Sequence, residues 1–302
     1  MLKLEKLTKK FDSHFAVDQL SFEVKEGEVF GFLGPNGAGK TTTVRMLSSL
    51  IGPTSGTAYV NHFEIQKDDQ NIRRSVGILT ESPGLYDNLS AEYNLDIFAN
   101  LYEVKNPKGQ VEKYLRLLGL WERRFDLSGT FSKGMKQKLA ISRALLHEPR
   151  VLFLDEPTSG LDPKSAKTVR DFIRELSKQG RTIFICTHNL DEADRLCDRI
   201  GVVKTRLLVI DTPKKLRQSL FGRKVVFHLA TIQDHVPAKI RKLNYVQGVE
   251  VLDNKLLVTV DDPESRNPEI IRVLIEEGGD IKFVGELRHS LEDVYLRLMQ
   301  DV

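Results

Sequence analysis

Long apolar runs are missing from this chain of 302 residues. No stretch approaches the roughly 18 consecutive apolar residues that cross a bilayer. The best runs, at residues 151–154 and 183–186, have the length of a strand. The start, MLKLEKLTKK, carries a charge every few residues and no apolar core, so we expect no secretory signal. We also expect that the chain cannot form a membrane pore by itself.

Cysteine is scarce, with Cys186 in an apolar run and Cys197 in a helical segment. Two cysteines do not make a disulfide framework, so they are typical of a reducing cytoplasm, and we expect neither to be catalytic. An excess of one charge sign is missing as well, because the net charge is +3 and acids and bases are interspersed. This distribution gives no reason to expect nucleic acid as a partner.

Apolar periodicity predicts an α/β domain over residues 1–220. Residues 1–30 alternate as antiparallel strands, and an apolar strand at 28–33 then leads through Gly34 into a helix. A helical period from 90 to 147 predicts a helical insertion, at about residues 88–147. Apolar strands at 151–154 and 182–186, each followed by a helix, indicate a mostly parallel sheet with its site at the carboxyl ends of the strands.

The character of the sequence changes after residue 222, and residues 223–302 predict a second, smaller domain. The expected order is strand, helix, strand pair, helix and strand, which is the α+β ferredoxin-like plan. The strand pair turns at Asp253 and Asn254, the next helix begins at Pro268, and Ser290 caps a final helix. No catalytic constellation is visible here, so we predict a regulatory or dimer-supporting domain.

Residues 34–41, GPNGAGKT, match the phosphate-loop pattern in full. The glycines let backbone N–H groups surround phosphates, Lys40 bridges them, and the Thr41 hydroxyl holds Mg²⁺. A plain glycine-rich turn is the alternative, and the strand before and helix after the loop disfavour it. The predicted ATP-binding residues of this loop are Asn36, Gly37, Ala38, Gly39, Lys40, Thr41 and Thr42.

Two carboxylates, Asp155 and Glu156, follow the strand at 151–154. Adjacent acids after a strand can equally be a helix-capping pair, and alone the pair does not decide between the two interpretations. The segment resembles the Walker B motif of nucleotide hydrolases. The resemblance implies that Asp155 holds Mg²⁺ through water and that Glu156 polarises the attacking water as general base.

The segment FSKGMKQ, residues 131–137, opens a helix and offers Ser132 and free N–H groups to a second anion. This position is too far along the chain to serve the phosphate of Lys40, and a plain N-cap is the alternative. The segment resembles the signature motif of ATP-binding cassette (ABC) proteins, LSGGQ, with Lys133 and Met135 as departures. The resemblance implies that Ser132 and Gly134 contact an ATP held by a partner subunit.

Further motifs follow in the order of the ABC family. Residues 159–162, SGLD, resemble the D-loop, which implies that Asp162 acts across a dimer interface. His188 is similar to the switch histidine that hydrogen-bonds the γ-phosphate, although a lone histidine after a strand is usually structural. Phe11 takes the place of the aromatic residue that stacks on adenine, supported by Val17, although an isolated Phe would belong to the core.

Glu81 stands where the family usually has a glutamine that reaches the metal and the attacking water. A carboxylate could ligate Mg²⁺ there but would add negative charge near the γ-phosphate, and a solvated loop acid is the alternative. The next loop, residues 82–88, resembles the groove that receives the coupling helix of a membrane subunit. We expect Leu85 and Tyr86 to be exposed in it.

The chain as a whole resembles the ATP-binding subunits of ABC transporters, and SKGMKQ together with SLEDVYL at 290–296 is similar to the bacterial ABC-2-type exporters. The resemblance implies a P-loop ABC cassette with an antiparallel β lobe. It implies a head-to-tail pair of identical or paralogous subunits that closes on two ATPs and Mg²⁺. The pair would energise a separate integral-membrane permease from the cytoplasmic face of the cell membrane.

Two other functions are weighed against this one. A soluble ABC ATPase acting on ribosomes or DNA would usually carry two cassettes, a long coiled-coil insertion or a metal hook, and none is visible in the sequence. A non-hydrolysing regulatory cassette would explain Glu81 and Lys133. The catalytic residues that it would be expected to lack are nevertheless present, namely Lys40, Thr41, Asp155, Glu156 and His188.

Overall fold

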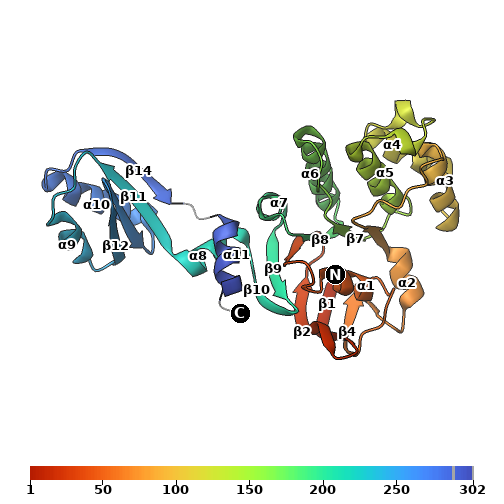
Figure 1. Ribbon diagram of the computed structural model, residues 1–302, viewed down its shortest axis with the longest axis horizontal. Coiled ribbons are helices and arrows are strands. Elements are labelled where there is room, and N and C mark those ends of the chain that lie inside the picture. The colour runs from red at the N-terminus through yellow and green to blue at the C-terminus, as the bar shows by residue number, and fades with distance from the viewer. Residues whose placement is uncertain (288–289, 301–302) are drawn as a thin grey trace. The chain divides into compact units, whose positions relative to one another are not determined.

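The computed structural model describes residues 1–287 and 290–300 and divides into two compact units, Met1–Thr212 and Pro213–Val302 (Figure 1). The sequence placed the boundary at residues 220–223. The structure places it earlier because helix α8 (Pro213–Phe221) packs against α11 (Leu291–Gln300), the last helix of the C-terminal unit. The sequence of a helix between two domains does not indicate which domain the helix packs on.

The N-terminal unit contains an antiparallel sheet in the order β2-β1-β4-β5. A tight turn at Asp12 and Ser13 joins the first two strands and pairs Phe11 with His14, which confirms the antiparallel strands predicted for residues 1–30. The strands are β1 (Leu2–Phe11), β2 (His14–Val24), β4 (Ser55–Val60) and β5 (Phe63–Glu64).

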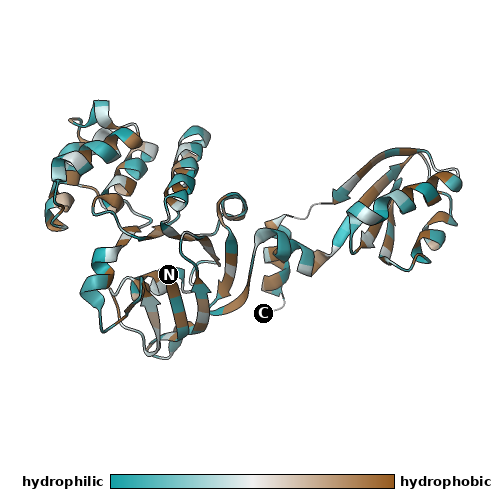
Figure 2. Ribbon diagram, turned by 180° about the vertical axis from the view of Figure 1, so that it is seen from behind, coloured by the Kyte–Doolittle hydropathy of each residue, from teal (hydrophilic) through white to brown (hydrophobic). Residues whose placement is uncertain are grey.

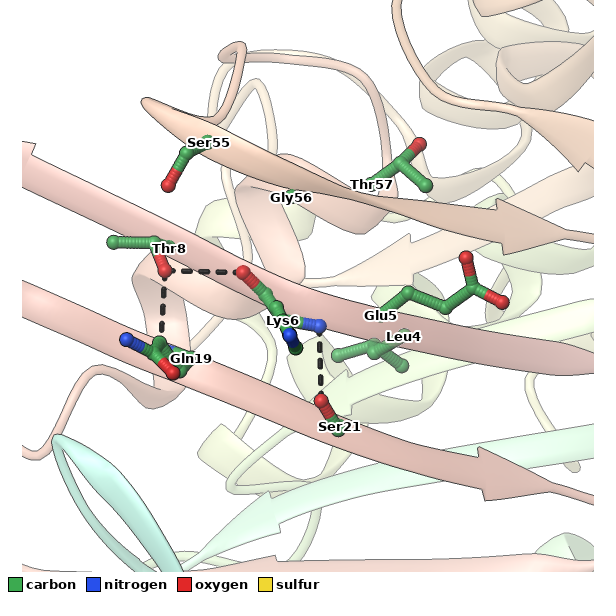
Figure 3. Close-up of a pocket in the computed structure, with 9 residues that line it drawn as sticks. All are labelled: Leu4, Glu5, Lys6, Thr8, Gln19, Ser21, Ser55, Gly56 and Thr57. Carbon is green, nitrogen blue, oxygen red and sulfur yellow. Dashed lines mark hydrogen bonds between the residues drawn. The ribbon is translucent and has the colours of Figure 1, made fainter.

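A hollow of about 760 Å³ lies on this sheet between β1, β2 and β4 (Figure 3). The strand pairing shifts register here, and Lys6 and Gln19 have positive φ angles. The hydroxyl of Thr8 accepts the N–H of Gln19, and that of Ser21 accepts the N–H of Lys6. The hydroxyls satisfy backbone donors where the ladder is irregular, so we attribute the hollow to β-bulges.

The second sheet of this unit has six strands in the order β10-β9-β3-β8-β7-β6. Its neighbouring strands are parallel except for the β9–β10 pair, and β3, β7 and β8 are buried along almost their whole length, as parallel strands covered on both faces are. The strands are β3 (Val29–Leu33), β6 (Val76–Leu79), β7 (Val151–Asp155), β8 (Thr182–Thr187), β9 (Arg199–Lys204) and β10 (Arg206–Asp211).

The predicted helical insertion is present between β6 and β7, where Figure 1 shows α3, α4 and α5 side by side. Polar side chains begin these helices: Ser90, Asn106 and Ser132 each accept a backbone N–H of the first turn. The helices of the unit are α1 (Lys40–Leu47), α2 (Asp69–Ser75), α3 (Ala91–Leu101), α4 (Pro107–Leu117), α5 (Lys133–Leu145), α6 (Pro163–Lys178) and α7 (Leu190–Leu196), with 3-10 turns at Trp121–Arg123 and Ser128–Thr130.

Helices of both units mix hydrophilic and hydrophobic residues along their length (Figure 2). Over residues 1–287 and 290–300, no helix is both long and apolar enough to span a bilayer.

Five phenylalanines form the centre of the core between the two sheets. The ring of Phe184 in β8 lies 5.2–6.5 Å, between centroids, from the rings of Phe22, Phe30, Phe32 and Phe153. Phe22 comes from the antiparallel sheet and the others come from the parallel sheet. These contacts bind the sheets together, since offset and edge-on aromatic pairs add to the free energy gained by burial.

The C-terminal unit has an antiparallel sheet in the order β12-β13-β11-β14, which is the strand order of the predicted ferredoxin-like plan. Helix α10 begins at Pro263, five residues before the predicted start at Pro268, so Pro268 lies inside the helix. The prediction was wrong because proline usually begins a helix, and this helix contains two candidates. The elements are β11 (Arg223–Leu229), α9 (Val236–Arg241), β12 (Val246–Leu252), β13 (Lys255–Val260), α10 (Pro263–Glu276) and β14 (Ile281–Leu287).

We expect Phe184→Ala to lower the free energy of unfolding of the N-terminal unit by about 3–5 kcal/mol, because it opens a cavity among the five rings. The measurement is urea unfolding followed by the fluorescence of Trp121, the single tryptophan. Phe125→Ala is the matched control, since Phe125 is exposed and should change stability by only about 0.5 kcal/mol. Equal effects of the two substitutions would contradict the role given to the cluster.

Candidate active site

Three loops meet at the carboxyl edge of the parallel sheet, because β3, β8 and β7 are neighbours there. They enclose a pocket of about 400 Å³. Apart from Ala16, every residue that lines it was singled out from the sequence. The lining residues are Phe11, Ala16, Asn36, Gly37, Gly39, Lys40, Thr41, Thr42, Glu81, Asp155, Glu156 and His188.

The phosphate loop closes around its own lysine. The Nζ atom of Lys40 donates to the carbonyl oxygen of Gly34 at 2.6 Å and to that of Pro35 at 3.0 Å, and the residue is buried. The N–H of Ala38 donates to the same Pro35 carbonyl at 3.2 Å, and Ala38 lies beneath the loop rather than in the pocket. Lys40 therefore places a cation at the mouth of the loop, where phosphate oxygens can bind it.

Two glycines of the loop differ in how much room their surroundings leave for a side chain. Gly37 and Gly39 both have a left-handed backbone, with φ of 82° and 93°. A Cβ atom on Gly39 would lie 2.2 Å from the carbonyl oxygen of Ala16, whereas one on Gly37 would meet no atom within 4 Å. Strand β2 thus approaches the loop so closely that position 39 has no room for a side chain.

The acids of the pocket are held at its floor. The hydroxyl of Thr41 donates to Oδ2 of Asp155 at 3.3 Å. Burial, followed by the nearby charges of Glu156 and Glu81, raises the pKa of Asp155, while the Thr41 hydrogen bond and Lys40 oppose the shift. Hydroxyl and carboxylate oxygens are the ligands that Mg²⁺ prefers, so this pair suits the ion.

No group of three or more His, Cys, Asp or Glu side chains in the described part of the chain could hold a metal by itself. A Mg²⁺ ion usually keeps several waters and takes further oxygens from substrate phosphates. The few protein oxygens in the pocket therefore match that ion better than a metal that needs a full protein cage.

Glu156 is fixed by the end of strand β8. Its Oε1 accepts the backbone N–H of His188 at 2.8 Å and lies 2.6 Å from the ring Nδ1, while its Oε2 accepts the hydroxyl of Thr187 at 3.0 Å. Its own backbone has a positive φ of 49° and donates to the carbonyl oxygen of Cys186. The backbone conformation and these bonds aim the carboxylate into the pocket beside Asp155. The His188 side chain is 66% exposed and contacts Glu156 here.

Ser132, Gly134 and Asp162 do not line this pocket. Ser132 caps α5 by accepting the N–H of Met135, and Asp162 caps α6 by accepting the N–H groups of Lys164 and Ser165. Gly134 packs closely against Ser165, so the predicted signature and D-loop segments adjoin one another. They form a second cluster outside the phosphate pocket.

Phe11 and Val17, predicted to stack on adenine and to support the stacking residue, differ in position. Phe11 ends β1, lines the pocket and is 49% exposed. Val17 is fully buried beneath Gly39, and its neighbour Ala16 lines the pocket in its place. Because side chains alternate along a strand, the inward direction of Val17 would have indicated Ala16 as the residue facing the loop.

Comparisons with known proteins identify the family. Residues 17–159 match the family model described as ABC transporter, and residues 212–299 match the model described as ATP-binding protein DrrA1-3-like, C-terminal domain. The chain is 36% identical over 300 residues to the bacitracin transport ATP-binding protein BcrA of Bacillus licheniformis, which covers 99% of this chain and 97% of that protein. The chain belongs to the ABC transporter ATP-binding proteins.

Other ABC proteins agree with this assignment. The daunorubicin resistance ATP-binding protein DrrA2 of Streptomyces coeruleorubidus is 33% identical over 308 residues, covering 98% of this chain and 94% of that protein. A solved dimeric ATP-binding cassette in a post-hydrolysis state, bound to ADP and Pi, superposes with a TM-score of 0.64 at 25% identity, covering 70% of this chain and 98% of that chain.

These findings confirm the predicted ABC cassette fold and the prediction of an ATP-hydrolysing transporter subunit related to the bacterial ABC-2-type exporters. They do not favour the alternative of an ABC ATPase that acts on ribosomes or DNA. The roles of individual residues in this ABC subunit remain predictions.

We expect Gly39→Ala to weaken ATP binding at least about a hundredfold, because its Cβ cannot be accommodated without moving β2 or the loop. Gly37→Ala is the matched control. It should cost only the free energy of a strained left-handed backbone, about 1–2 kcal/mol. Binding of a fluorescent ATP analogue measures both. Equal losses for the two variants would contradict the close approach of β2.

Proposed function

We propose that this ABC subunit hydrolyses ATP in the pocket between the phosphate loop and Glu156, and that hydrolysis drives export through a separate membrane permease. The observation that carries the proposal is the convergence of Lys40, Asp155, Glu156 and His188 from three loops on one pocket. These groups can bind phosphates and can bind and polarise a water molecule.

The phosphates of ATP bind the loop N–H groups, the positive end of α1 and the ammonium of Lys40. Thr41 and Asp155 would hold Mg²⁺, which would neutralise phosphate charge when bound, and Glu81 lines the pocket beside them. Glu156 accepts a proton from a water molecule whose oxygen attacks the γ-phosphorus. The bond from that phosphorus to the bridging oxygen breaks, and ADP and phosphate leave.

A second copy of the chain, or a paralogue, completes the site. Ser132 is exposed and Gly134 sits at the start of α5, where N–H groups are available to an anion. In a head-to-tail pair with two-fold symmetry, each subunit would present this helix start and the segment ending at Asp162 to the ATP of the other. Closure on two ATPs and reopening after hydrolysis would supply the motion for transport.

Four exposed apolar side chains, which we call the docking patch, come from residues 86–93 and 124–127, in and just before the helical insertion. Backbone bonds from Ala91 and Glu92 to residues 126 and 124 join the two segments that carry them. Tyr86 is 51% exposed, whereas Leu85 is half-buried, contrary to the prediction. An exposed apolar surface suits the permease as partner, with this subunit on the cytoplasmic face of the membrane. The patch consists of Tyr86, Tyr93, Phe125 and Leu127.

The relatives support antibiotic-like compounds as the class of cargo that is exported. BcrA and DrrA2 are named for bacitracin transport and daunorubicin resistance, and their similarity to this chain extends through the C-terminal domain. The cargo itself would contact the permease rather than this subunit.

We expect Glu156→Gln to reduce ATP hydrolysis at least about a hundredfold, because the amide cannot accept the proton of the attacking water. ATP affinity should change little, since the phosphate loop is intact, and light scattering should detect a stable dimer in ATP. Glu122→Gln, an exposed position, is the matched control. Retained hydrolysis would overturn the role of Glu156, and a monomer in saturating ATP would count against the paired mechanism.

Purification in mild detergent from native membranes should recover a multi-spanning hydrophobic protein with this subunit. The double variant Tyr86→Ala, Phe125→Ala should lose that protein, because it removes the apolar surface of the docking patch. Phe283→Ala is the matched control, since Phe283 is equally exposed in the C-terminal unit. Recovery with ribosomal or DNA-repair proteins instead would refute the transporter function.

A further inference from the structure

A second carboxylate lies behind Glu156. Glu192, in helix α7, is only 3% exposed and reaches the base of the pocket without lining it. Its Oε1 accepts the hydroxyl of Thr158 at 2.5 Å, and its Oε2 lies 3.3 Å from the hydroxyl oxygen of Thr187. The same Thr187 oxygen lies 3.0 Å from Oε2 of Glu156. One hydroxyl thus stands between two carboxyl groups.

Counting protons decides how this arrangement is satisfied. A threonine hydroxyl has one proton to donate and two lone pairs that accept. The N–H of Asn189 occupies one lone pair of Thr187, at 3.0 Å. If both carboxyl groups were ionised, both would need the single Thr187 proton. One carboxylate oxygen would then face the Thr187 oxygen with no proton between them. Such a contact is costly in a buried site.

A proton on Glu192 removes the conflict. Its Oε2–H then donates to the remaining lone pair of Thr187, Thr187 donates to Glu156, and Thr158 donates to Oε1 of Glu192. Every donor in this chain of hydrogen bonds is used once, and every bond points toward Glu156. We propose that Glu192 is a neutral carboxylic acid that positions Glu156 through Thr187, which extends the proposed function of Glu156 as the base.

The surroundings of Glu192 agree with a neutral form. Burial, and then the negative charge of Glu156 just after β7, raise the pKa of Glu192, while the hydrogen bonds of the two threonines and Arg170 on α6 oppose the shift. The thiol of Cys197, which also interacts with Glu192, has its own pKa raised by burial. A neutral acid also supports Glu156 without adding a third charge to the Asp155 and Glu156 pair.

The position of Thr158 gives this chain of bonds a second end. Thr158 lies between Glu156 and Asp162 in the segment that leads to α6, and its hydroxyl is bound to Glu192 alone among the bonds described. Glu192 therefore connects the catalytic carboxylate to the segment that we expect to meet the second subunit. The chain of bonds thus runs from the segment that leads to α6 to the base.

The first experiment compares Glu192→Ala with Glu192→Gln. Alanine removes the bond that orients Thr187, so kcat for ATP should fall at least about tenfold while KM stays within about threefold, since the phosphate loop is untouched. Glutamine has the shape of the neutral acid, accepts from Thr158 and donates to Thr187, so it should restore kcat to within about threefold of the natural chain. Loss of kcat in Glu192→Gln, or full activity in Glu192→Ala, would overturn the proposal.

A second pair of variants covers the case in which Glu192→Ala does not fold. Thr187→Val keeps the shape of the side chain and removes the hydroxyl, so kcat should fall as in Glu192→Ala, whereas Thr187→Ser should retain most of it. Equal activity of the valine and serine variants would overturn the proposal.

Infrared spectroscopy tests the protonation directly. At neutral pH, the spectrum of the natural chain minus that of Glu192→Gln should contain the carbonyl stretch of one protonated carboxylic acid, and absence of that band would overturn the proposal. The band is recorded without ATP, so it does not depend on the role of Glu156. If Glu156→Gln still hydrolyses ATP, the proposed function fails while the band remains.

Discussion

The order of three parallel strands is the constraint on which the active site depends. Strands β3, β8 and β7 are neighbours, so the loop that begins with Gly34, the end of β8 at Thr187 and the pair after β7 meet at one edge. The phenylalanine cluster packs against these strands and supports them, because four of its five rings come from β3, β7 and β8. The geometry at the phosphates therefore depends on the packing of the core.

Negative charge is concentrated at this edge of the sheet, and nearby cations and hydrogen-bond donors are placed to compensate it. Asp155, Glu156 and Glu81 face one pocket, and their mutual repulsion adds to burial in raising the pKa of Asp155. Lys40 opposes this effect, and backbone and side-chain donors hold Glu156. A bound nucleotide would bring still more negative charge, so the cations and N–H groups of the loop determine whether the pocket can accept it.

The sequence predicted the residues that follow strands within short motifs, because the order of residues there directly dictates the local structure. Lys40, Asp155 and Glu156 are of this kind, whereas the strand order of the C-terminal unit followed from the succession of its predicted strands and helices. Residues that act through tertiary contacts were missed: Ala16 faces the loop only because β2 lies against Gly39, and the roles of Thr187 and Glu192 become visible only once α7 is placed against β3 and β8. The packing of α8 was missed for the same reason, whereas the start of α10 was missed because the helix contains two prolines.

The contact between α8 and α11 has a consequence for the architecture of the chain. The first and last helices of the C-terminal unit pack on each other, so the segment leaves Thr212, completes its sheet and returns to where it began. Among the residues that the structure describes, no strand of the cassette sheets pairs with a strand of this unit. A module closed on itself in this way can be joined to an ancestral cassette at a single peptide bond, and it can diverge in surface and size without disturbing the hydrogen bonding of the ATPase core.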